Sequence, residues 1–205
     1  SRNAQFIIIM SFLLGLTGSI GMGKSTTAGF FKDAGCDVWD ADAAVHRLYA
    51  KQGAAVAPLS NLFPKALIEG TISRQVLKHE LQKNPDLIGQ LEAIVHPLVA
   101  QDRQNFIDSA QSDILVFDIP LLFETGADAH MNAVICVTID EEEQKKRVLD
   151  RATMSEKMFE QIKSRQWSNS RKCEKADFVI LTDTLEHVHV QVDNLVAKLR
   201  VVKDA

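Results

Sequence analysis

The feature that most constrains this 205-residue chain is the segment GSIGMGKS at residues 18–25. It matches G-x-x-x-x-G-K-[S/T], the pattern of a phosphate-binding loop between a strand and a helix. The glycines let the backbone turn tightly and bring its N–H groups close to phosphate oxygens. Lys24 is long enough to reach the β- and γ-phosphates of a nucleotide, and the Ser25 hydroxyl can bind Mg²⁺. The segment therefore predicts a site for nucleotide phosphates.

The flanking sequence fits this motif better than it fits a chance glycine-rich turn. The apolar run at residues 12–16 predicts a buried strand, and residues 26–32 predict a helix with apolar side chains available for packing. Strand, loop and helix in this order are the context that the motif requires. The positive end of the helix dipole would also favour a bound phosphate.

The remaining apolar runs alternate with helical patterns, which predicts a parallel sheet covered by helices. Each run is short and bounded by polar residues or glycine, as expected of a buried parallel strand. The predicted strands are residues 12–16, 36–39, 114–117, 133–138 and 178–181.

The gap between the second and third predicted strands, residues 42–113, has helical periodicity throughout. A connection of this size is no simple crossover, so it predicts a helical subdomain inserted beside the sheet. Pro97 is expected to bend a helix or to restart it after His96.

Net charge and cysteine content limit the kinds of partner that the protein can bind and the cellular compartment in which we expect it. The net charge of −4 provides no broad basic surface, so no nucleic-acid partner is expected. Cys36, Cys136 and Cys173 are odd in number, far apart in the sequence and without C-x-x-C spacing. We therefore expect a reducing cytosol and three unremarkable buried thiols.

The apolar segment at residues 6–16 resembles a short signal core but is too short to span a bilayer. No small-residue cleavage site follows it, and cleavage in the phosphate loop would destroy that loop. A strand preceded by an extension is the better interpretation. Met10 could be the native start, which would make residues 1–9 an upstream extension.

Acidic residues follow two predicted strands, at the end where open parallel sheets bind ligands. Asp40 and Asp42, if extended, would share one face. They could orient Mg²⁺ or accept a proton from an attacking hydroxyl, or Asp42 could merely cap a helix starting at Ala43. The spacing favours neither. Asp118 ends an apolar run as the acidic residue of a Walker-B strand does, which predicts a carboxylate near Mg²⁺.

Arg147 and Arg151 are four residues apart and therefore share one helix face. Two guanidiniums on one face can clamp phosphate oxygens and stabilise charge during phosphoryl transfer. On an average helix a solvated charged face is the commoner explanation, and Glu143 has the spacing to pair with Arg147. A histidine such as His96 is likewise more often structural than catalytic.

Together these and further segments resemble the dephospho-CoA kinase family over about residues 14–182. The phosphate loop alone is shared by many functions, whereas D-A-D, H-P and P-L-L-F-E in this order are far more specific. The resemblance is carried by residues 16–26, 40–42, 91–97, 118–124 and 176–180, with Gly70, Ser73, Arg74, Gln144, Arg147, Arg151, Gln166 and Lys172.

The resemblance implies an enzyme that uses ATP and Mg²⁺ to phosphorylate the ribose 3′-hydroxyl of dephospho-CoA, giving coenzyme A and ADP. It implies one α/β domain with a P-loop nucleoside-triphosphate-hydrolase-like parallel sheet flanked by helices. The core would be residues 10–42, 113–145 and 172–205, with a helical acceptor-binding insertion at about residues 43–112 and a small lid at about residues 146–171. We expect a cytoplasmic monomer or weak homo-oligomer without a membrane partner.

The resemblance also implies catalytic roles. Asp42 matches the family's proposed base, and Lys24, Arg147 and Arg151 would act on the transferring phosphate. The two arginines would belong to the mobile lid, with residues 152–155 as its hinge.

Ligand contacts are implied in the same way. Arg74 and His96 would contact the acceptor together with the base Asp42, and Ser25 would bind Mg²⁺ with Asp118 a weaker, water-separated candidate. ATP would be bound by Gly18, Ser19, Ile20, Gly21, Met22, Gly23, Lys24, Ser25 and Thr26.

Three positions depart from the family pattern, and two other functions remain open. Ala152 stands where many relatives have Asp, residues 182–183 replace an acidic-Asn pair, and Leu81 lies near a common Phe position. Another small-metabolite kinase would differ in the inserted helices that select the acceptor. A non-catalytic ATP-binding regulator would tolerate loss of Asp42 and the lid arginines, yet all are present. A GTPase is disfavoured because no N-K-x-D-like segment occurs.

Overall fold

The computed structural model describes residues 11–151 and 154–203. They form two compact units. The phosphate-loop unit ends at Trp39 and resumes at Ala110, and the helical unit is Asp40–Ser109. The proposed start at Met10 with its upstream extension, and the first two residues of the predicted hinge, 152–153, lie outside the described residues.

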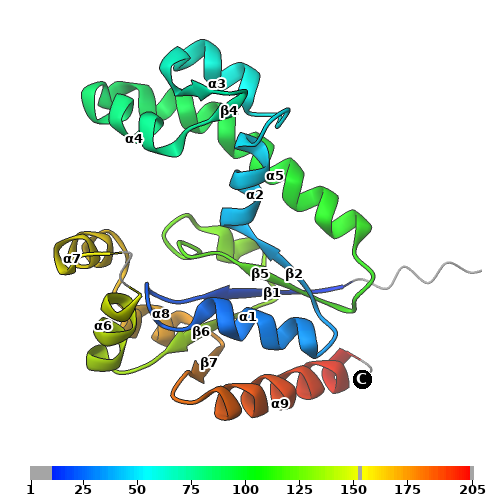
Figure 1. The fold of residues 1–205 in the computed structure, drawn as a ribbon. Helices are drawn as coiled ribbons and strands as arrows, with labels where there is room; N and C mark the ends of the chain where they lie inside the picture. Colours follow the sequence, from blue (N-terminus) through cyan, green and yellow to red (C-terminus); the bar gives the residue numbers. More distant parts are fainter. Residues whose placement is uncertain (1–10, 152–153, 204–205) are drawn as a thin grey trace, which may run out of the picture. The chain divides into compact units, whose positions relative to one another are not determined.

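The phosphate-loop unit is built on a sheet whose described strands run in the order β2-β5-β1-β6-β7 (Figure 1). β1 pairs in parallel with β5 and β6, and β6 pairs in parallel with β7. The predicted parallel sheet is confirmed, with strand ends shifted by at most one residue. The bounds are β1 (Phe12–Thr17), β2 (Asp37–Asp40), β5 (Ile114–Asp118), β6 (Ala133–Thr138) and β7 (Phe178–Leu181).

Helices pack on this sheet. α1 (Lys24–Asp33) and α9 (Leu185–Lys203) lie side by side on one face (Figure 1). Phe31 of α1 and Val192 of α9 are fully buried against Leu14 and Ile135 of the strands, which forms the main core. The remaining helical segments of the unit are a 3₁₀ turn (Ala127–His130), α6 (Glu141–Asp150), α7 (Glu156–Arg165) and α8 (Asn169–Lys175).

The helical unit has a separate apolar core, in which Leu59, Phe63 and Leu77 are buried. Its helices are α2 (Ala41–Tyr49), α3 (Val56–Leu62), α4 (Arg74–Lys83) and α5 (Ile88–Ser109), with 3₁₀ turns at Pro64–Ala66 and Pro85–Leu87. No helix within the described parts of either unit combines the length and the apolar content needed to cross a membrane.

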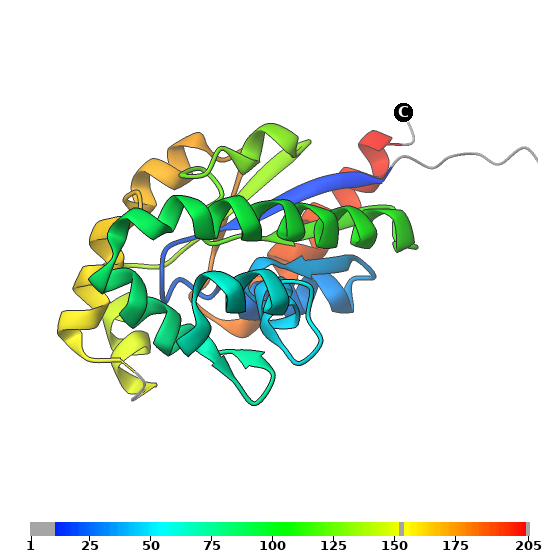
Figure 2. The same cartoon turned by 90° about the horizontal axis from the view of Figure 1, so that it is seen from above.

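Two features of the helical unit differ from the sequence prediction. β3 (Leu67–Ile68) and β4 (Thr71–Ile72) form an antiparallel hairpin where only helix was expected. Its turn residues Glu69 and Gly70 both have positive φ angles, 50° and 83°, as a tight two-residue hairpin turn requires. α5 continues through Pro97 over 22 residues (Figure 2), so the helix is not restarted there.

Candidate active site

The phosphate loop connects β1 to α1, as the motif predicts. Gly21 and Gly23 have φ angles of 78° and 88°, which side-chain-bearing residues adopt only with strain. A Cβ atom at Gly18 would lie 2.5 Å from Cγ2 of Val137, and one at Gly21 would lie 2.5 Å from Cγ2 of Val148. The glycines are therefore required by packing as well as by the turn.

Lys24 forms an ion pair with Asp118 at the carboxyl end of β5. The pair is largely shielded, because the side chains are 17% and 3% exposed. Parallel pairing of β5 with β1 sets Asp118 opposite Leu16, two residues before the loop begins. The acidic residue at the end of the Walker-B-like strand thus lies at the phosphate loop and holds its lysine.

Arg147 reaches the loop through Thr182, the first residue after β7. Its Nη2 donates to the Thr182 carbonyl at 2.6 Å and its Nη1 to the Thr182 hydroxyl at 3.2 Å. The hydroxyl in turn donates to the Met22 carbonyl at 2.7 Å. Glu143 also pairs with Arg147, at 3.1 Å from Nε, so the predicted pairing of these two residues is confirmed. A role of Arg147 on phosphate stays a prediction.

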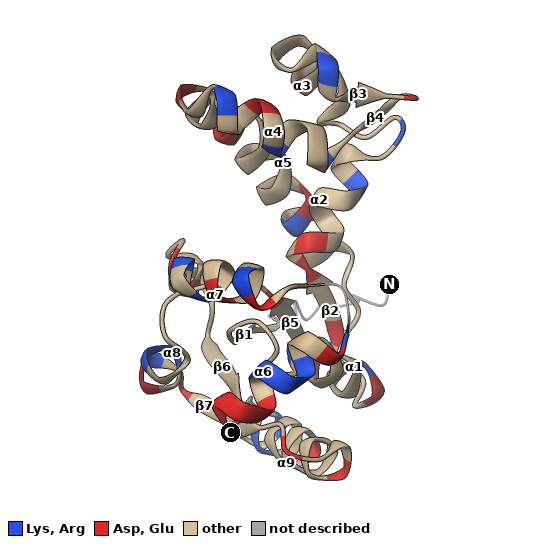
Figure 3. Ribbon diagram, turned by 60° about the vertical axis from the view of Figure 1, so that its left-hand side comes forward, with Lys and Arg blue, Asp and Glu red and all other residues tan. Residues whose placement is uncertain are grey.

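Arg151 follows α6 and is exposed. Acidic residues fill the first turn of α6, with basic residues further along (Figure 3). This polarity suits the helix dipole, because carboxylates stabilise an N-terminus. Arg151 therefore lies at the end of the helix, and its approach to the loop stays a prediction.

Side chains from the segment after α7 bind the loop backbone. The Ser19 N–H donates to Asn169 Oδ1 at 3.0 Å, and the Ile20 N–H donates to Gln166 Oε1 at 3.3 Å. From α6, Gln144 Nε2 donates to the carbonyl of the same loop residue, Ile20, at 2.7 Å. The predicted lid segment therefore contacts the loop directly.

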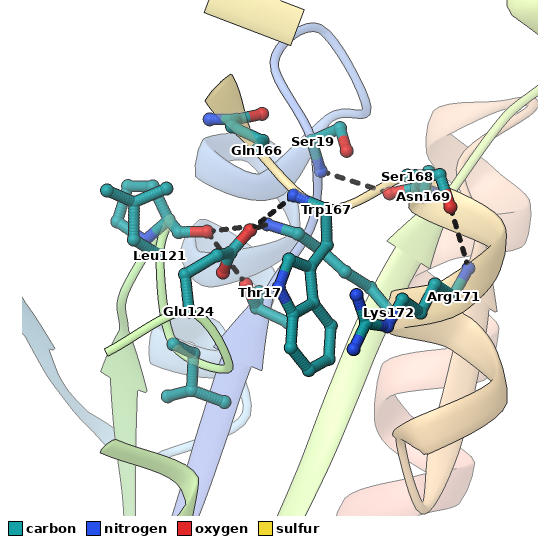
Figure 4. A network of polar contacts seen from close by, with 12 residues as sticks. Thr17, Ser19, Leu121, Glu124, Gln166, Trp167, Ser168, Asn169, Arg171 and Lys172 are labelled. Carbon is teal, nitrogen blue, oxygen red and sulfur yellow. Dashed lines mark hydrogen bonds and ion pairs between the residues drawn. The ribbon is translucent and has the colours of Figure 1, made fainter. Parts of the chain in front are cut away.

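A buried polar network lies next to these contacts (Figure 4). Lys172 is fully buried, and its Nζ lies 2.9 Å from both the Pro120 carbonyl and Glu124 Oε1. The Trp167 N–H donates to the same carboxylate oxygen at 2.8 Å, and the Thr17 hydroxyl donates to the Pro120 carbonyl at 3.1 Å. The network ties α8 and the residues before it to the ends of β1 and β5.

Aromatic stacking reinforces this attachment. The rings of Phe123 and Trp167 stack with centroids 5.9 Å apart, and the Arg171 guanidinium lies 3.5 Å from the Trp167 centroid. Sequence reasoning noted Lys172 and Gln166 only through the family resemblance and missed Trp167 and Asn169. Their partners are far away in the chain, so no local pattern marks them.

The acceptor candidates lie in the helical unit. Asp40 caps α2, since its Oδ1 accepts the Ala43 N–H at 2.9 Å, and the helix already begins at Ala41. The predictions that Asp42 caps the helix, or shares an extended face with Asp40, are both wrong because Asp42 is inside the first helical turn. Its side chain is exposed.

Arg74 lies close to Asp42 within the same unit. Its Nη2 donates to the Asp42 carbonyl at 3.3 Å, and its guanidinium carbon is 5.8 Å from the Tyr49 ring centroid. Burial raises the pKa of Tyr49, while the positive charge of Arg74 opposes that rise. His96 is exposed on α5. The structure brings Asp42 and Arg74 together, and the approach of these groups to the phosphate loop stays a prediction.

The candidate Mg²⁺ ligands are oxygen atoms. The Ser25 side chain is exposed in the first turn of α1, and Asp118 supplies a carboxylate. Mg²⁺ keeps several waters and takes one or two protein ligands together with substrate phosphates. In the described ranges no group of three or more His, Cys, Asp or Glu residues could hold a metal. The donor set fits an ion that is bound jointly with nucleotide phosphates.

Comparisons with known proteins agree with this geometry. A model of the dephospho-CoA kinase family matches residues 12–186. The dephospho-CoA kinase of Ruegeria pomeroyi is 60% identical, covering 93% of this chain and 97% of that protein. The dephospho-CoA kinase of Jannaschia sp. is 52% identical, covering 93% and 98%.

Solved structures show the same fold. A crystal structure from Thermus thermophilus has a TM-score of 0.82 at 29% identity, covering 92% of this chain and 98% of that one. A dephospho-CoA kinase from Campylobacter jejuni has a TM-score of 0.63 at 22% identity, covering 92% and 97%. Because the family model spans most of the sequence and relatives exceed half identity over nearly their whole length, this chain belongs to the dephospho-CoA kinase family.

Proposed function

We propose that this chain transfers the γ-phosphoryl group of ATP to the ribose 3′-hydroxyl of dephospho-CoA, giving coenzyme A and ADP. The observation that carries the proposal is the Lys24–Asp118 pair at a complete phosphate loop, in a chain of this family. A cation held at the loop by a shielded carboxylate is positioned before the nucleotide arrives.

On the ATP side, the loop backbone would surround the phosphates, and Lys24, held at the loop by Asp118, would contact their oxygens. A bound Mg²⁺ would neutralise phosphate charge during transfer. Ser25 would hold it directly, and Asp118 would do so through a water molecule. The exposed hydroxyl of Ser25 and the carboxylate position of Asp118 support these roles.

Arg147 and Arg151 would stabilise charge on the transferring group. Arg147 is supported by its contacts with Thr182, which connect it to the Met22 carbonyl in the loop. Arg151 would approach when the lid closes, which excludes water and limits wasteful hydrolysis of ATP.

On the acceptor side, Asp42 would orient the ribose hydroxyl and accept its proton. Because Asp40 provides the helix cap, the Asp42 carboxylate is not needed for that task. Arg74 and His96 would contact the acceptor, as exposed cationic or polar side chains of the same unit. We also propose a cytoplasmic enzyme that is a monomer or a weak homo-oligomer.

A coupled assay of ADP release tests the function. Purified protein with Mg²⁺ and ATP would be offered dephospho-CoA, adenosine or nucleoside monophosphates at equal concentration. We expect ADP release to depend on dephospho-CoA and to be much slower with the other acceptors. Equal rates with nucleoside monophosphates would indicate a different kinase, and ATP binding without ADP release would indicate a regulator.

A further inference from the structure

Two cysteines lie next to each other in the phosphate-loop unit. Cys136 on β6 is fully buried, whereas Cys173 on α8 is partly exposed. Their Sγ atoms are 3.1 Å apart, although the residues are 37 positions apart in the chain. The expectation of three unremarkable buried thiols is therefore wrong for this pair, because packing of α8 against β6 brings them together.

Asn169 connects the two thiols to the phosphate loop. Its Nδ2 lies 3.6 Å from Cys173 Sγ, and its Oδ1 lies 3.9 Å from Cys136 Sγ. The same Oδ1 accepts the Ser19 N–H at 3.0 Å. One side chain thus contacts both sulfurs and the backbone of the loop.

The two sulfurs differ in reactivity. Hydrogen bonding with Cys136 lowers the pKa of the Cys173 thiol, burial opposes this, and hydrogen bonding with Thr138 lowers it further. Hydrogen bonding with Cys173 and burial raise the pKa of the Cys136 thiol well above its usual range. Burial likewise raises the pKa of Cys36 to about 11. Since the thiolate is the nucleophile, we expect Cys173 to react first, whereas Cys36 and Cys136 stay protonated near neutral pH.

We propose that Cys136 and Cys173 form an oxidation site, which hydrogen peroxide converts reversibly into a disulfide, and that the disulfide weakens ATP binding through Asn169. Formation of the bond is independent of the proposed function, whereas its effect on ATP rests on that function.

The chemistry balances in two steps. The Cys173 thiolate attacks one peroxide oxygen, so an S–O bond forms, the O–O bond breaks and the leaving hydroxide takes a proton to become water. The Cys136 sulfur then attacks the sulfenic sulfur of Cys173, forming the S–S bond and breaking the S–O bond. The proton of Cys136 and the departing hydroxide form a second water. Two sulfurs lose two electrons in total, and the peroxide gains them.

The disulfide would disturb the phosphate loop because the distance between two bonded sulfur atoms is fixed. A disulfide holds its sulfurs about 2.0 Å apart, so the two sulfurs must approach by about 1 Å. Asn169 precedes Cys173 by one helical turn and lies on the same helix face. We expect the accompanying shift of α8 to break the hydrogen bond between the Ser19 N–H and Asn169 Oδ1. Loss of one such hydrogen bond corresponds to a roughly two- to tenfold weaker interaction.

Peptide mapping tests the bond itself. Purified protein would be treated with hydrogen peroxide, blocked with an alkylating reagent and digested with trypsin without reduction. We expect residues 104–145 linked to residues 173–175, and loss of the link after dithiothreitol. Irreversible oxidation of Cys173, or a link that involves Cys36, would overturn the proposal.

Kinetics on the same samples test the consequence. We expect peroxide to raise KM for ATP two- to tenfold in the wild type and in Cys36→Ser, and dithiothreitol to reverse the change. Cys173→Ser and Cys136→Ala should keep a constant KM under peroxide. A fully linked protein with unchanged KM, or a Cys173→Ser variant that responds like wild type, would overturn the link to ATP. An inactive reduced wild type would instead refute the proposed function, because the mapping result stands apart from turnover.

Discussion

The two units hold their functional candidates in different ways. In the phosphate-loop unit, Lys24, Arg147 and Lys172 are 17%, 23% and 0% exposed, and each contacts a carboxylate. In the helical unit, Asp42, Arg74 and His96 are all exposed. Lys24 and Arg147, both proposed for phosphate handling, have charged protein partners in this structure. Ser25 and Arg151 of the same unit are exposed, as the acceptor candidates are. Substitution of the shielded Lys24 should therefore affect stability and activity together, and substitution of the exposed Asp42 should affect activity alone.

The largest expected effect is on turnover, from Asp42→Asn in the helical unit. Loss of a general base costs roughly 10²–10⁴-fold in kcat, and KM for either substrate should change less. Because Asp42 is exposed and does not cap α2, the midpoint of urea unfolding should stay at the wild-type value. Steady-state kinetics with saturating Mg²⁺ measure the effect.

Asp40→Ala is the matched control for this prediction. It removes the α2 cap and should lower the free energy of unfolding by about 0.5–2 kcal/mol, with little change in kcat. Near-wild-type turnover in Asp42→Asn, with a loss of turnover in Asp40→Ala, would move the base to Asp40.

Lys24→Ala should change both activity and stability. Removing a preorganised cation that faces developing charge costs roughly 10²–10³-fold in kcat. The same change removes an ion pair from the shielded Asp118, which should lower the free energy of unfolding by about 1.5–3 kcal/mol. Turnover at saturating Mg²⁺-ATP and urea unfolding measure the two effects.

The double variant Lys24→Ala/Asp118→Asn separates the effect on turnover from the effect on the free energy of unfolding. Neutralising the carboxylate should restore much of the stability and none of the activity. Wild-type turnover in Lys24→Ala would contradict the assigned role of the lysine.

Lys172→Met should act mainly on stability, because Lys172 is fully buried and its Nζ contacts the Pro120 carbonyl and the Glu124 carboxylate. Breaking a buried ion pair by removing one partner costs about 3–5 kcal/mol, which lowers Tm by roughly 6–20 °C in a chain of this size. Lys175→Met is the control, since that side chain is 45% exposed and its pair with Asp128 should contribute about 0–1 kcal/mol. Equal Tm values for the two variants in calorimetry would contradict the prediction that the buried Lys172 ion pair contributes more to stability than the exposed Lys175 pair.

Arg147→Lys should have the smallest effect. Lysine cannot reproduce the paired donation from the guanidinium to Thr182, so KM for ATP should rise roughly two- to tenfold. Lys146→Arg, on the exposed side of the same helix, should leave KM unchanged. A greater rise in KM for ATP in Lys146→Arg than in Arg147→Lys would contradict the proposal that Arg147 acts on the phosphate loop.

The parts of the fold that the sequence predicted are those with local signals. Apolar runs marked the strands of the main sheet, and glycine spacing marked the phosphate loop. The β3–β4 hairpin had a readable signal in Glu69-Gly70 between two pairs of β-branched or apolar residues, but its strands are only two residues long. Asp42 was misplaced because α2 begins two residues earlier than expected, at Ala41.

The network around Lys172 could not be predicted from local patterns. Trp167 and Lys172 contact residues 43 and 52 positions earlier in the chain. Such pairs are set by the order of strands in the sheet and by packing of α8, not by spacing along the chain. The contact between Cys136 and Cys173 arises in the same way.

The most direct test of the account is to locate the transferred phosphate. The protein would be incubated with Mg²⁺, ATP and dephospho-CoA, and the product examined by phosphorus NMR with correlation to the ribose protons. The account predicts a new phosphomonoester signal that couples to the ribose 3′ proton and grows in step with ADP. Release of inorganic phosphate without that signal, or a phosphate on any other position, would contradict it.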